Sequence, residues 1–310
     1  MEYKEKNFIS AVIYVHNAEK QIAAFMRGLI SCLETNFDHS EIICVNDCSS
    51  DNSKNIIREL AKETEVNITI INLSYFHGLE TAINAGMDMS IGDYVLEFDS
   101  VYCDFEFSLV MDVYRRSLEG YDIVSASPAR PQKLSSSFFY KVFNCFTPEN
   151  HKLSTESFRI LSRRVINRLS SMNKTVVYRK ALYAVSGFKA DKIVYTPKTT
   201  SRNPSDPSEK KYRMRLATNC LILFTDFGYR ISIFMTAMMM LISIIMVLYT
   251  FIAFFTLHPI EGWTTTVLFL SVCFFGLFAI LSVIVKYLQI ILELVFKRQH
   301  YNLESIEKLN

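Results

Sequence analysis

A chain of 310 residues, half of them hydrophobic, can form one large domain or two modest ones. The seven cysteines are odd in number, scattered and without a CxxC pair, so they indicate neither a disulfide framework nor a zinc site. This cysteine pattern makes a reducing cytoplasm the simplest compartment. The charged first seven residues lack the apolar core of a signal peptide.

The formal net charge of +2 hides an uneven distribution of charge along the chain. Residues 1–150 hold 12 Lys and Arg against 22 Asp and Glu, whereas residues 151–230 hold 17 against 5. A basic block just before an apolar region indicates contact with anionic lipid headgroups or with a phosphorylated ligand. No nucleic-acid partner is expected.

Strand and helix patterns alternate through the first 130 residues. Helical spacing of apolar residues predicts helices at 20–35 and 78–90, and the polar cluster at 46–53 is both a turn and a good helix start. Such alternation implies βαβ units and a mostly parallel sheet, an α/β fold. Short apolar runs predict its strands at residues 8–15, 41–45, 68–73, 94–98 and 122–126.

The pattern changes after residue 130. Helical spacing predicts helices at 137–146 and 158–170. Residues 196–208 carry three prolines and predict a loop over the surface or the active site. Residues 210–230 are basic first and apolar afterwards, which indicates an interfacial region that enters a membrane.

Two long runs without charge follow, at residues 231–257 and 267–285. Each can span a bilayer, which needs about 20 apolar residues. The link between them has no Lys or Arg and both flanks are basic, so we expect both chain ends in the cytoplasm. The alternative is a pair of buried core helices, which rarely lack charge for so long. The expected parts are a cytoplasmic domain at 1–209, a basic amphipathic region at 210–230, transmembrane helices at 231–257 and 264–285, and a cytoplasmic tail at 286–310.

The apolar run from Tyr94 to Phe98 ends in Asp99, where the chain leaves the sheet. In open α/β sheets, ligands bind outside the carboxyl ends of the strands. A carboxylate there can hold a cation that neutralises a diphosphate, because hard cations take oxygen ligands. The alternative is an ordinary aspartate between a strand and a loop.

Three motifs in order carry a resemblance to family 2 glycosyltransferases. Residues 9–20, ISAVIYVHNAEK, look like the opening strand and turn of that family, and residues 45–51, VNDCSSD, are similar to its VDDGSxD loop. Residues 78–86, GLETAINAG, together with 92–94 and Phe98-Asp99-Ser100, resemble the helix and strand that lead to the family's DxD element. The order and spacing together make the resemblance specific.

The second half resembles one branch of that family, the polyisoprenyl-phosphate glycosyltransferases. The similar segments are 137–144, 157–164 and 186–189, and the ending at 286–301 matches as well. The branch includes dolichol-phosphate mannose synthases and bactoprenol glucosyltransferases with two C-terminal membrane helices. The resemblance covers nearly the whole chain and implies a Rossmann-like GT-A catalytic domain followed by two transmembrane helices.

The resemblance also implies roles for individual residues. Asn17, Glu19 and Asp47 would bind the nucleotide, and Asp99 would face the sugar diphosphate and any metal as a catalytic residue. Arg159 would be catalytic and would grip the acceptor phosphate, because a guanidinium binds phosphate with two parallel bonds. Further expected contacts of the acceptor phosphate are Arg130, Arg202 and Lys211.

Alternatives stay open at two of these positions, Asp47 and Arg159. Asp47 and its neighbour Asp51 could instead cap a helix. Arg159 could be a solvated charge on a helix.

Several positions depart from the family's usual residues. In the DxD element Val101 replaces the second acid, so the pair supplies at most one metal ligand, and we expect Mg²⁺ or Mn²⁺ to bind weakly and only with the donor. Ser157 replaces the Asp that usually precedes Phe-Arg. The other departures are Tyr14, His16, Asn46 and Cys48.

The expected reaction is inverting transfer of a sugar from a UDP- or GDP-linked donor to a polyprenyl phosphate. We expect it at the cytoplasmic face of a bacterial inner membrane, and relatives in the branch form homo-oligomers. A phosphate acceptor is already an anion and needs no strong general base, whereas a hydroxyl acceptor does. Two alternatives are a transferase to a glycolipid or polysaccharide hydroxyl, with Glu156 as base, and a catalytically silent membrane-anchored partner protein.

Overall fold

The computed structural model describes residues 4–129, 155–171, 178–198 and 303–309, with scattered helical positions between 234 and 291. The chain divides into two compact units. The first unit comprises Met1–Leu216 and Arg298–Asn310, and the second comprises Ala217–Lys297. All described strands and all described side chains of the candidate site belong to the first unit.

The eight strands of the described residues form one mixed sheet in the order β7-β5-β6-β4-β1-β2-β3-β8. The neighbours β1 and β2, β2 and β3, β1 and β4, and β5 and β7 are parallel. Strand β6 is antiparallel to β4 and β5, and β8 is antiparallel to β3. The strands are β1 (Ile9–Val15), β2 (Ser40–Asn46), β3 (Asn67–Leu73), β4 (Tyr94–Phe98), β5 (Ile123–Pro128), β6 (Phe158–Ser162), β7 (Ala190–Tyr195) and β8 (Leu303–Lys308).

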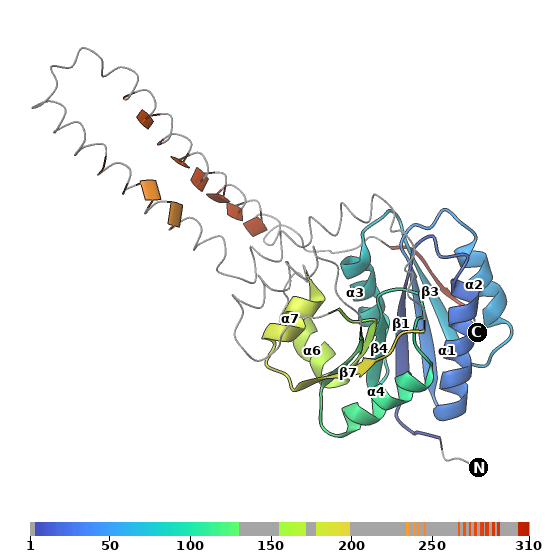
Figure 1. Ribbon diagram of the computed structural model, residues 1–310. Coiled ribbons are helices and arrows are strands. Elements are labelled where there is room, and N and C mark those ends of the chain that lie inside the picture. The colour runs from blue at the N-terminus through green and yellow to red at the C-terminus, as the bar shows by residue number, and fades with distance from the viewer. Residues whose placement is uncertain are drawn as a thin grey trace, which may run out of the picture. The chain divides into compact units, whose positions relative to one another are not determined.

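Helices cover both faces of this sheet (Figure 1). Buried side chains of α1, α2 and α4 form one hydrophobic cluster with one face, and those of α3, α6 and α7 form a second cluster with the other. The helices are α1 (Ile22–Asn36), α2 (Ser53–Ala61), α3 (Leu79–Met89), α4 (Ser108–Leu118), α6 (Arg163–Ser171) and α7 (Arg179–Val185).

Strand β1 shows why the sheet is covered on both faces. Ile9, Ala11 and Ile13 point into the first cluster, whereas Val12 points into the second, and all four are fully buried. Alternate residues of a strand face opposite sides of a sheet, so a strand buried on both faces has a nearly continuous apolar sequence. The α/β fold and the strands expected near the start of the chain are therefore confirmed.

One expected element is wrong. Helical spacing predicted a single helix at 158–170, but residues 158–162 form strand β6 and α6 begins at Arg163. Strand β6 lies between β4 and β5, where Phe158 and Ile160 face one cluster and Leu161 faces the other. A short apolar run that is buried on both faces cannot be distinguished from a buried helix by spacing alone.

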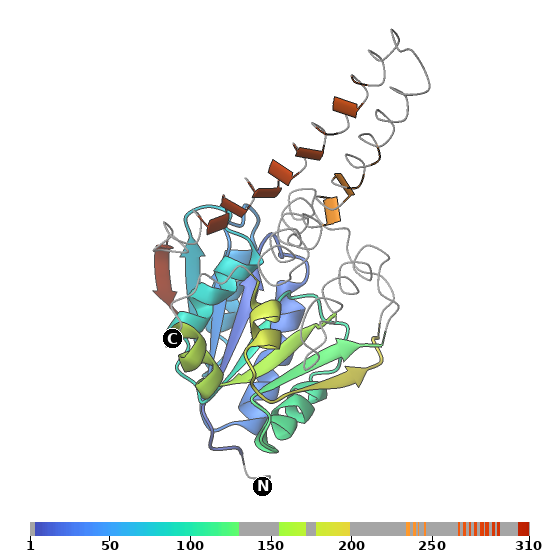
Figure 2. The same cartoon turned by 90° about the vertical axis from the view of Figure 1, so that its left-hand side faces the viewer.

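The chain's last strand, β8, was not predicted by the sequence, which indicated only a tail at 286–310. It pairs with the outer edge of β3, as Figure 2 shows. Asn72 of β3 donates hydrogen bonds to Ser305 Oγ and Glu307 Oε1, both at 2.9 Å. Glu307 also pairs with Lys54 at 3.0 Å and Arg58 at 2.8 Å, which attaches the strand to α2.

Other expected elements lie outside the described residues. These are the helix at 137–146, most of the loop at 196–208 and the amphipathic region at 210–230. Most positions of the two expected membrane spans lie outside them too. Within the described part of the chain, we find no helix with both the length and the apolar character needed to cross a membrane.

We expect Glu307→Gln to weaken the fold in a pH-dependent way. Burial raises the pKa of Glu307, but hydrogen bonds from Lys54 and Arg58 outweigh burial and lower this pKa below its ordinary value of 4.5. A lowered carboxylate pKa stabilises the folded state above about pH 4.5, and the effect is lost as the pH falls through the folded-state pKa. Denaturant unfolding at pH 7 should show a loss of about 0.5–1 kcal/mol.

The difference between the parent and Glu307→Gln should shrink as the pH falls below 4.5. Glu304→Gln, at an exposed position of the same strand, is the matched control and should unfold like the parent. A pH-independent loss in Glu307→Gln would contradict the ion-pair explanation.

Candidate active site

The loops that follow β1 and β2 are joined at the carboxyl ends of these strands. The backbone N–H of Asn17 donates to Ser49 Oγ at 3.1 Å, and Asn17 Oδ1 accepts from the backbone N–H of Ser50 at 2.9 Å. Asn17 has a φ of 47°, a left-handed conformation that asparagine tolerates better than most residues. Its side chain therefore fixes one loop against the other.

Glu19 makes a second link between the same two loops. Its Oε2 accepts from the backbone N–H of Asn52 at 3.2 Å, and its own N–H donates to Asp51 Oδ2 at 2.9 Å. Asp51 Oδ1 also accepts from the backbone N–H of Ser53 at 3.1 Å, at the start of α2. Asn17 and Glu19 are both exposed, so the residues expected beside the nucleotide lie at an accessible junction.

Asp47 is fully buried and holds the start of α3. Its Oδ1 accepts from the backbone N–H of His77 and its Oδ2 from that of Gly78, both at 2.8 Å. Oδ2 also accepts from the Tyr14 hydroxyl at 3.1 Å. Gly78 has a φ of 87°, which favours glycine. With these hydrogen bonds Asp47 fixes the start of α3 beside the joined loops. The contact of Asp47 with a nucleotide stays a prediction.

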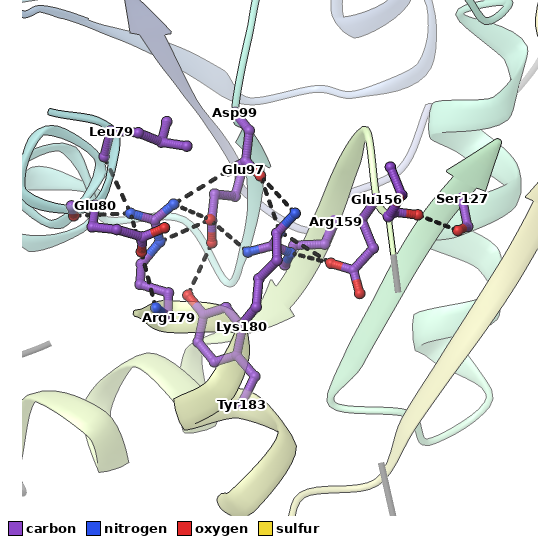
Figure 3. A network of polar contacts seen from close by, with 11 residues as sticks. Leu79, Glu80, Glu97, Asp99, Ser127, Glu156, Arg159, Arg179, Lys180 and Tyr183 are labelled. Carbon is purple, nitrogen blue, oxygen red and sulfur yellow. Dashed lines mark hydrogen bonds and ion pairs between the residues drawn. The ribbon is translucent and has the colours of Figure 1, made fainter. Parts of the chain in front are cut away.

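A buried cluster of charged residues lies at the carboxyl end of β4 (Figure 3). Glu97 of β4 is fully buried, and its Oε1 lies 2.8 Å from both Arg159 Nη1 and Arg179 Nη2. Glu97 Oε2 accepts from the Tyr183 hydroxyl at 2.9 Å. Burial and the Glu97 carboxylate raise the pKa of Tyr183 well above its usual value, so this hydroxyl stays protonated and donates.

Asp99 is contacted by three cations. Its Oδ1 lies 3.2 Å from Arg179 Nη2, and its Oδ2 lies 3.2 Å from Arg159 Nη2 and 3.1 Å from Lys180 Nζ. Burial raises the pKa of Asp99, but Lys180, Arg159 and Arg179 outweigh burial and hold this pKa well below its ordinary range. Asp99 is therefore a carboxylate whose charge is already compensated by the protein.

Two further acids complete the cluster. Glu80 of α3 accepts from the backbone N–H of Arg179 at 2.9 Å, and its burial raises its pKa although Arg179 opposes the shift. Glu156 Oε2 accepts from Arg159 Nε at 3.0 Å. The cluster thus joins β4, β6, α3 and α7, which lie far apart in the sequence.

The structure brings together two expected site residues, Asp99 and Arg159. Arg159 is not a solvated helix charge, since it lies on β6 and is 1% exposed. Sequence reasoning missed Glu80, Glu97, Arg179, Lys180 and Tyr183 as cluster members. Of these five residues, only Glu97 could have been identified from the sequence, because a charged residue inside a buried apolar strand requires a charged or polar partner. The expected phosphate contacts Arg130, Arg202 and Lys211 lie outside the described residues.

The described residues do not fit a protein-held divalent cation. Val101, at the second acidic position of DxD, is 6% exposed and packs in the first hydrophobic cluster. Asp104, the acid close in sequence that could substitute for the missing one, is buried and accepts from the Tyr195 hydroxyl at 2.6 Å. Among the described residues, no group of three His, Cys, Asp or Glu side chains could hold a metal ion. Both oxygens of Asp99 already contact cationic side chains.

The mixed sheet, the joined loops after β1 and β2, and the charged strand end define a GT-A-like α/β protein. A family description, Glycosyl transferase family 2, matches residues 10–169. The chain belongs to this family, and its enzyme class is that of the nucleotide-sugar glycosyltransferases.

Several bacterial proteins are similar in sequence. An uncharacterized glycosyltransferase of Synechocystis sp. is 29% identical over 195 residues, which span 60% of this chain and 60% of that protein. The uncharacterized glycosyltransferase YkcC of Bacillus subtilis is 24% identical over 90% of this chain and 88% of its own length. A prophage bactoprenol glucosyl transferase homolog of Escherichia coli is 25% identical over 72% of this chain and 74% of its own.

Solved structures show the same fold. Mannosyl-3-phosphoglycerate synthase from Rubrobacter xylanophilus has a TM-score of 0.51 and 17% identity, covering 69% of this chain and 74% of its own. Glucosyl-3-phosphoglycerate synthase from Mycobacterium tuberculosis, in complex with Mn²⁺, UDP and phosphoglyceric acid, has a TM-score of 0.51 and 14% identity. It covers 70% of this chain and 78% of its own, and at such identities the likeness concerns the fold alone.

We expect Glu97→Gln to destabilise the protein strongly. The substitution removes a buried negative charge that two guanidinium groups share, and a broken buried ion pair costs about 3–5 kcal/mol. Denaturant unfolding of the purified protein measures this loss. Glu106→Gln, which removes an exposed acid paired with Lys198, is the matched control and should cost less than about 1 kcal/mol. Equal stabilities of the two variants would contradict the proposed contribution of the buried cluster to the free energy of unfolding.

Proposed function

We propose that the protein transfers a sugar from a nucleotide donor to a polyprenyl phosphate on the cytoplasmic side of a membrane, with inversion. The observation that carries the proposal is the charged cluster at the end of β4, in which three cations pair with four acids. Strand β4 is parallel to β1, so the cluster lies at the same edge of the sheet as the loop after β1 that is expected to hold the nucleotide. Relatives that are 25–26% identical and named bactoprenol glucosyl transferases or a homolog support a polyprenyl phosphate acceptor.

In the proposed reaction, an oxygen of the acceptor phosphate attacks the anomeric carbon of the donor sugar. A new bond forms between this oxygen and the carbon, while the bond from the carbon to the diphosphate oxygen breaks on the opposite face. The nucleoside diphosphate leaves with the bonding electron pair. Positive groups near the diphosphate stabilise the negative charge that develops on it.

The state of Glu156 favours a phosphate acceptor over a hydroxyl acceptor. A hydroxyl acceptor needs a general base to remove its proton, and Glu156 was the candidate. In the structure Glu156 accepts a hydrogen bond from Arg159 at 3.0 Å, so it would have to leave this ion pair to take a proton. An acceptor phosphate is an anion near neutral pH and needs no such step.

The donor is proposed to bind at the loops after β1 and β2, with its base beside Asn17, Glu19 and Asp47. A uridine donor and a guanosine donor both stay hypotheses. A cation held mainly by the donor's own oxygens also stays a hypothesis. So do homo-oligomer formation and a contact of Arg159 with the acceptor phosphate.

Membrane attachment through the second unit is part of the proposal. Its described helical positions include a run of apolar side chains spaced three or four residues apart, which places them on one side of a helix. Each is 47–59% exposed, and a contiguous exposed apolar surface typically contacts lipid or a partner. The run consists of Leu277, Leu281, Ile284, Leu288 and Ile291.

Strand β8 supports the expected topology. The chain leaves the first unit at residue 216 and returns to the same unit at Arg298, where β8 pairs with β3. If residues 217–297 enter a bilayer, they must therefore cross it an even number of times. Two spans with both chain ends in the cytoplasm satisfy this condition, as the positive-inside rule also predicts.

The second candidate is a catalytically silent partner protein that keeps the fold. Val101 and the compensated charge of Asp99 favour it, because neither residue offers the free carboxylate pair of a DxD element. This candidate binds nucleotide or lipid without transfer, so an assay for transfer distinguishes it from the first.

We expect the purified protein to move labelled sugar from a UDP- or GDP-linked donor into a lipid fraction containing polyprenyl phosphate. Glu156→Gln should keep its rate within about threefold, because the proposed reaction needs no general base. A loss of about 100-fold or more would instead support a hydroxyl acceptor with Glu156 as base. No transfer from any nucleotide sugar would favour the silent partner.

The topology is tested by labelling and by a reporter. In Gly262→Cys, a membrane-impermeant thiol reagent should label the new cysteine from outside the cell, because residue 262 lies in the link between the two expected spans. A reporter fused at the C-terminus should behave as cytoplasmic. External exposure of that reporter would contradict both the topology and the pairing of β8 with β3.

A further inference from the structure

Lys180 lies beside Asp99, the acid that the resemblance to the DxD element assigns to a metal. Its Nζ lies 3.1 Å from Asp99 Oδ2, and its side chain is 12% exposed, compared with 1% for Arg159 and 2% for Arg179. Of these three cations, Lys180 is therefore the most accessible to a ligand. It is also the only one of the three with a single rotatable ammonium group, which can donate in three directions.

A divalent cation would have to displace this ammonium. Asp99 Oδ1 already faces Arg179 and Oδ2 faces Arg159 as well as Lys180. The other acids of the cluster, Glu80 and Glu97, are buried and bound to arginines. The loss of the second acid at Val101 and the presence of Lys180 thus occur together at one strand end.

We propose that the Lys180 ammonium, anchored by Asp99, replaces the divalent cation and binds the donor's diphosphate directly. The inference rests on the proposed use of a nucleotide donor and adds how the diphosphate is held. Asp99 then serves as a positioning residue that orients Lys180, rather than as a metal ligand. Donor binding accordingly needs no divalent cation.

The test measures nucleotide binding without transfer. UDP and GDP are each titrated calorimetrically into the purified full chain, once with EDTA and once with Mn²⁺. We expect one of the two nucleotides to bind in EDTA, with an affinity that Mn²⁺ changes by less than about threefold. Lys180→Met should weaken binding in EDTA by about 10- to 100-fold, because it removes a charge-assisted bond to phosphate.

Two variants separate the charge from other effects. Lys180→Arg keeps the positive charge and should retain most of the affinity in EDTA. Lys192→Met removes a lysine from an exposed position on β7 and should bind like the parent. If Lys180→Met does not fold, nucleotide binding by the parent that appears only with Mn²⁺ still overturns the inference, and Lys180→Gln replaces Lys180→Met as the variant without the charge.

The outcomes distinguish the inference from the proposed function. Nucleotide binding that appears only with Mn²⁺, or unchanged affinity of Lys180→Met in EDTA, overturns the role of Lys180 and leaves the transfer reaction standing. Failure of both nucleotides to bind under either condition overturns the nucleotide-donor proposal together with this inference.

Discussion

The shared ion pairing of Glu97 with Arg159 and Arg179 is the interaction on which the site depends. Ionised groups lose their hydration when they are buried, so each must find a partner or the fold loses several kcal/mol. Glu97 comes from β4, Arg159 from β6 and Arg179 from α7, and the pairs close at 2.8 Å. Satisfying these charges therefore requires that the three elements meet in one arrangement, and this arrangement places Asp99 and Lys180 together at the strand end.

The first half of the fold could be predicted because its signals are local. Strands β1 to β4 have apolar runs that end at polar turns, and α1 and α3 have clear helical spacing. Strand β6 was mistaken for a helix, since its burial on both faces erases the alternation of a strand. The charged strand β8 carries no apolar signal, and it exists because its backbone completes the edge of β3.

The site could be predicted only in part. Motif resemblance selected Asp99 and Arg159, which do lie together, but Asp99 also contacts Arg179 and Lys180, which lie 80 and 81 positions further along the chain. Spacing along the sequence cannot show that an arginine will be shared by three acids. The same limit explains Asp47, whose two oxygens are directed at backbone N–H groups 30 and 31 residues away rather than at the next helix.

A continuous set of side-chain hydrogen bonds connects β8 with the proposed nucleotide loops. Asn72 donates to Ser305 and accepts from Asn46, and Asn46 accepts in turn from the backbone N–H of Ser49, the residue whose hydroxyl holds Asn17. The chain returning from the second unit thus supports the edge of the sheet beside these loops.

Because an ammonium carries half the charge of a divalent cation, Lys180 alone would compensate the diphosphate only in part. Lys180 is one of the 17 Lys and Arg that face 5 acids in residues 151–230, so the proposal needs further positive charge from other members of this basic block.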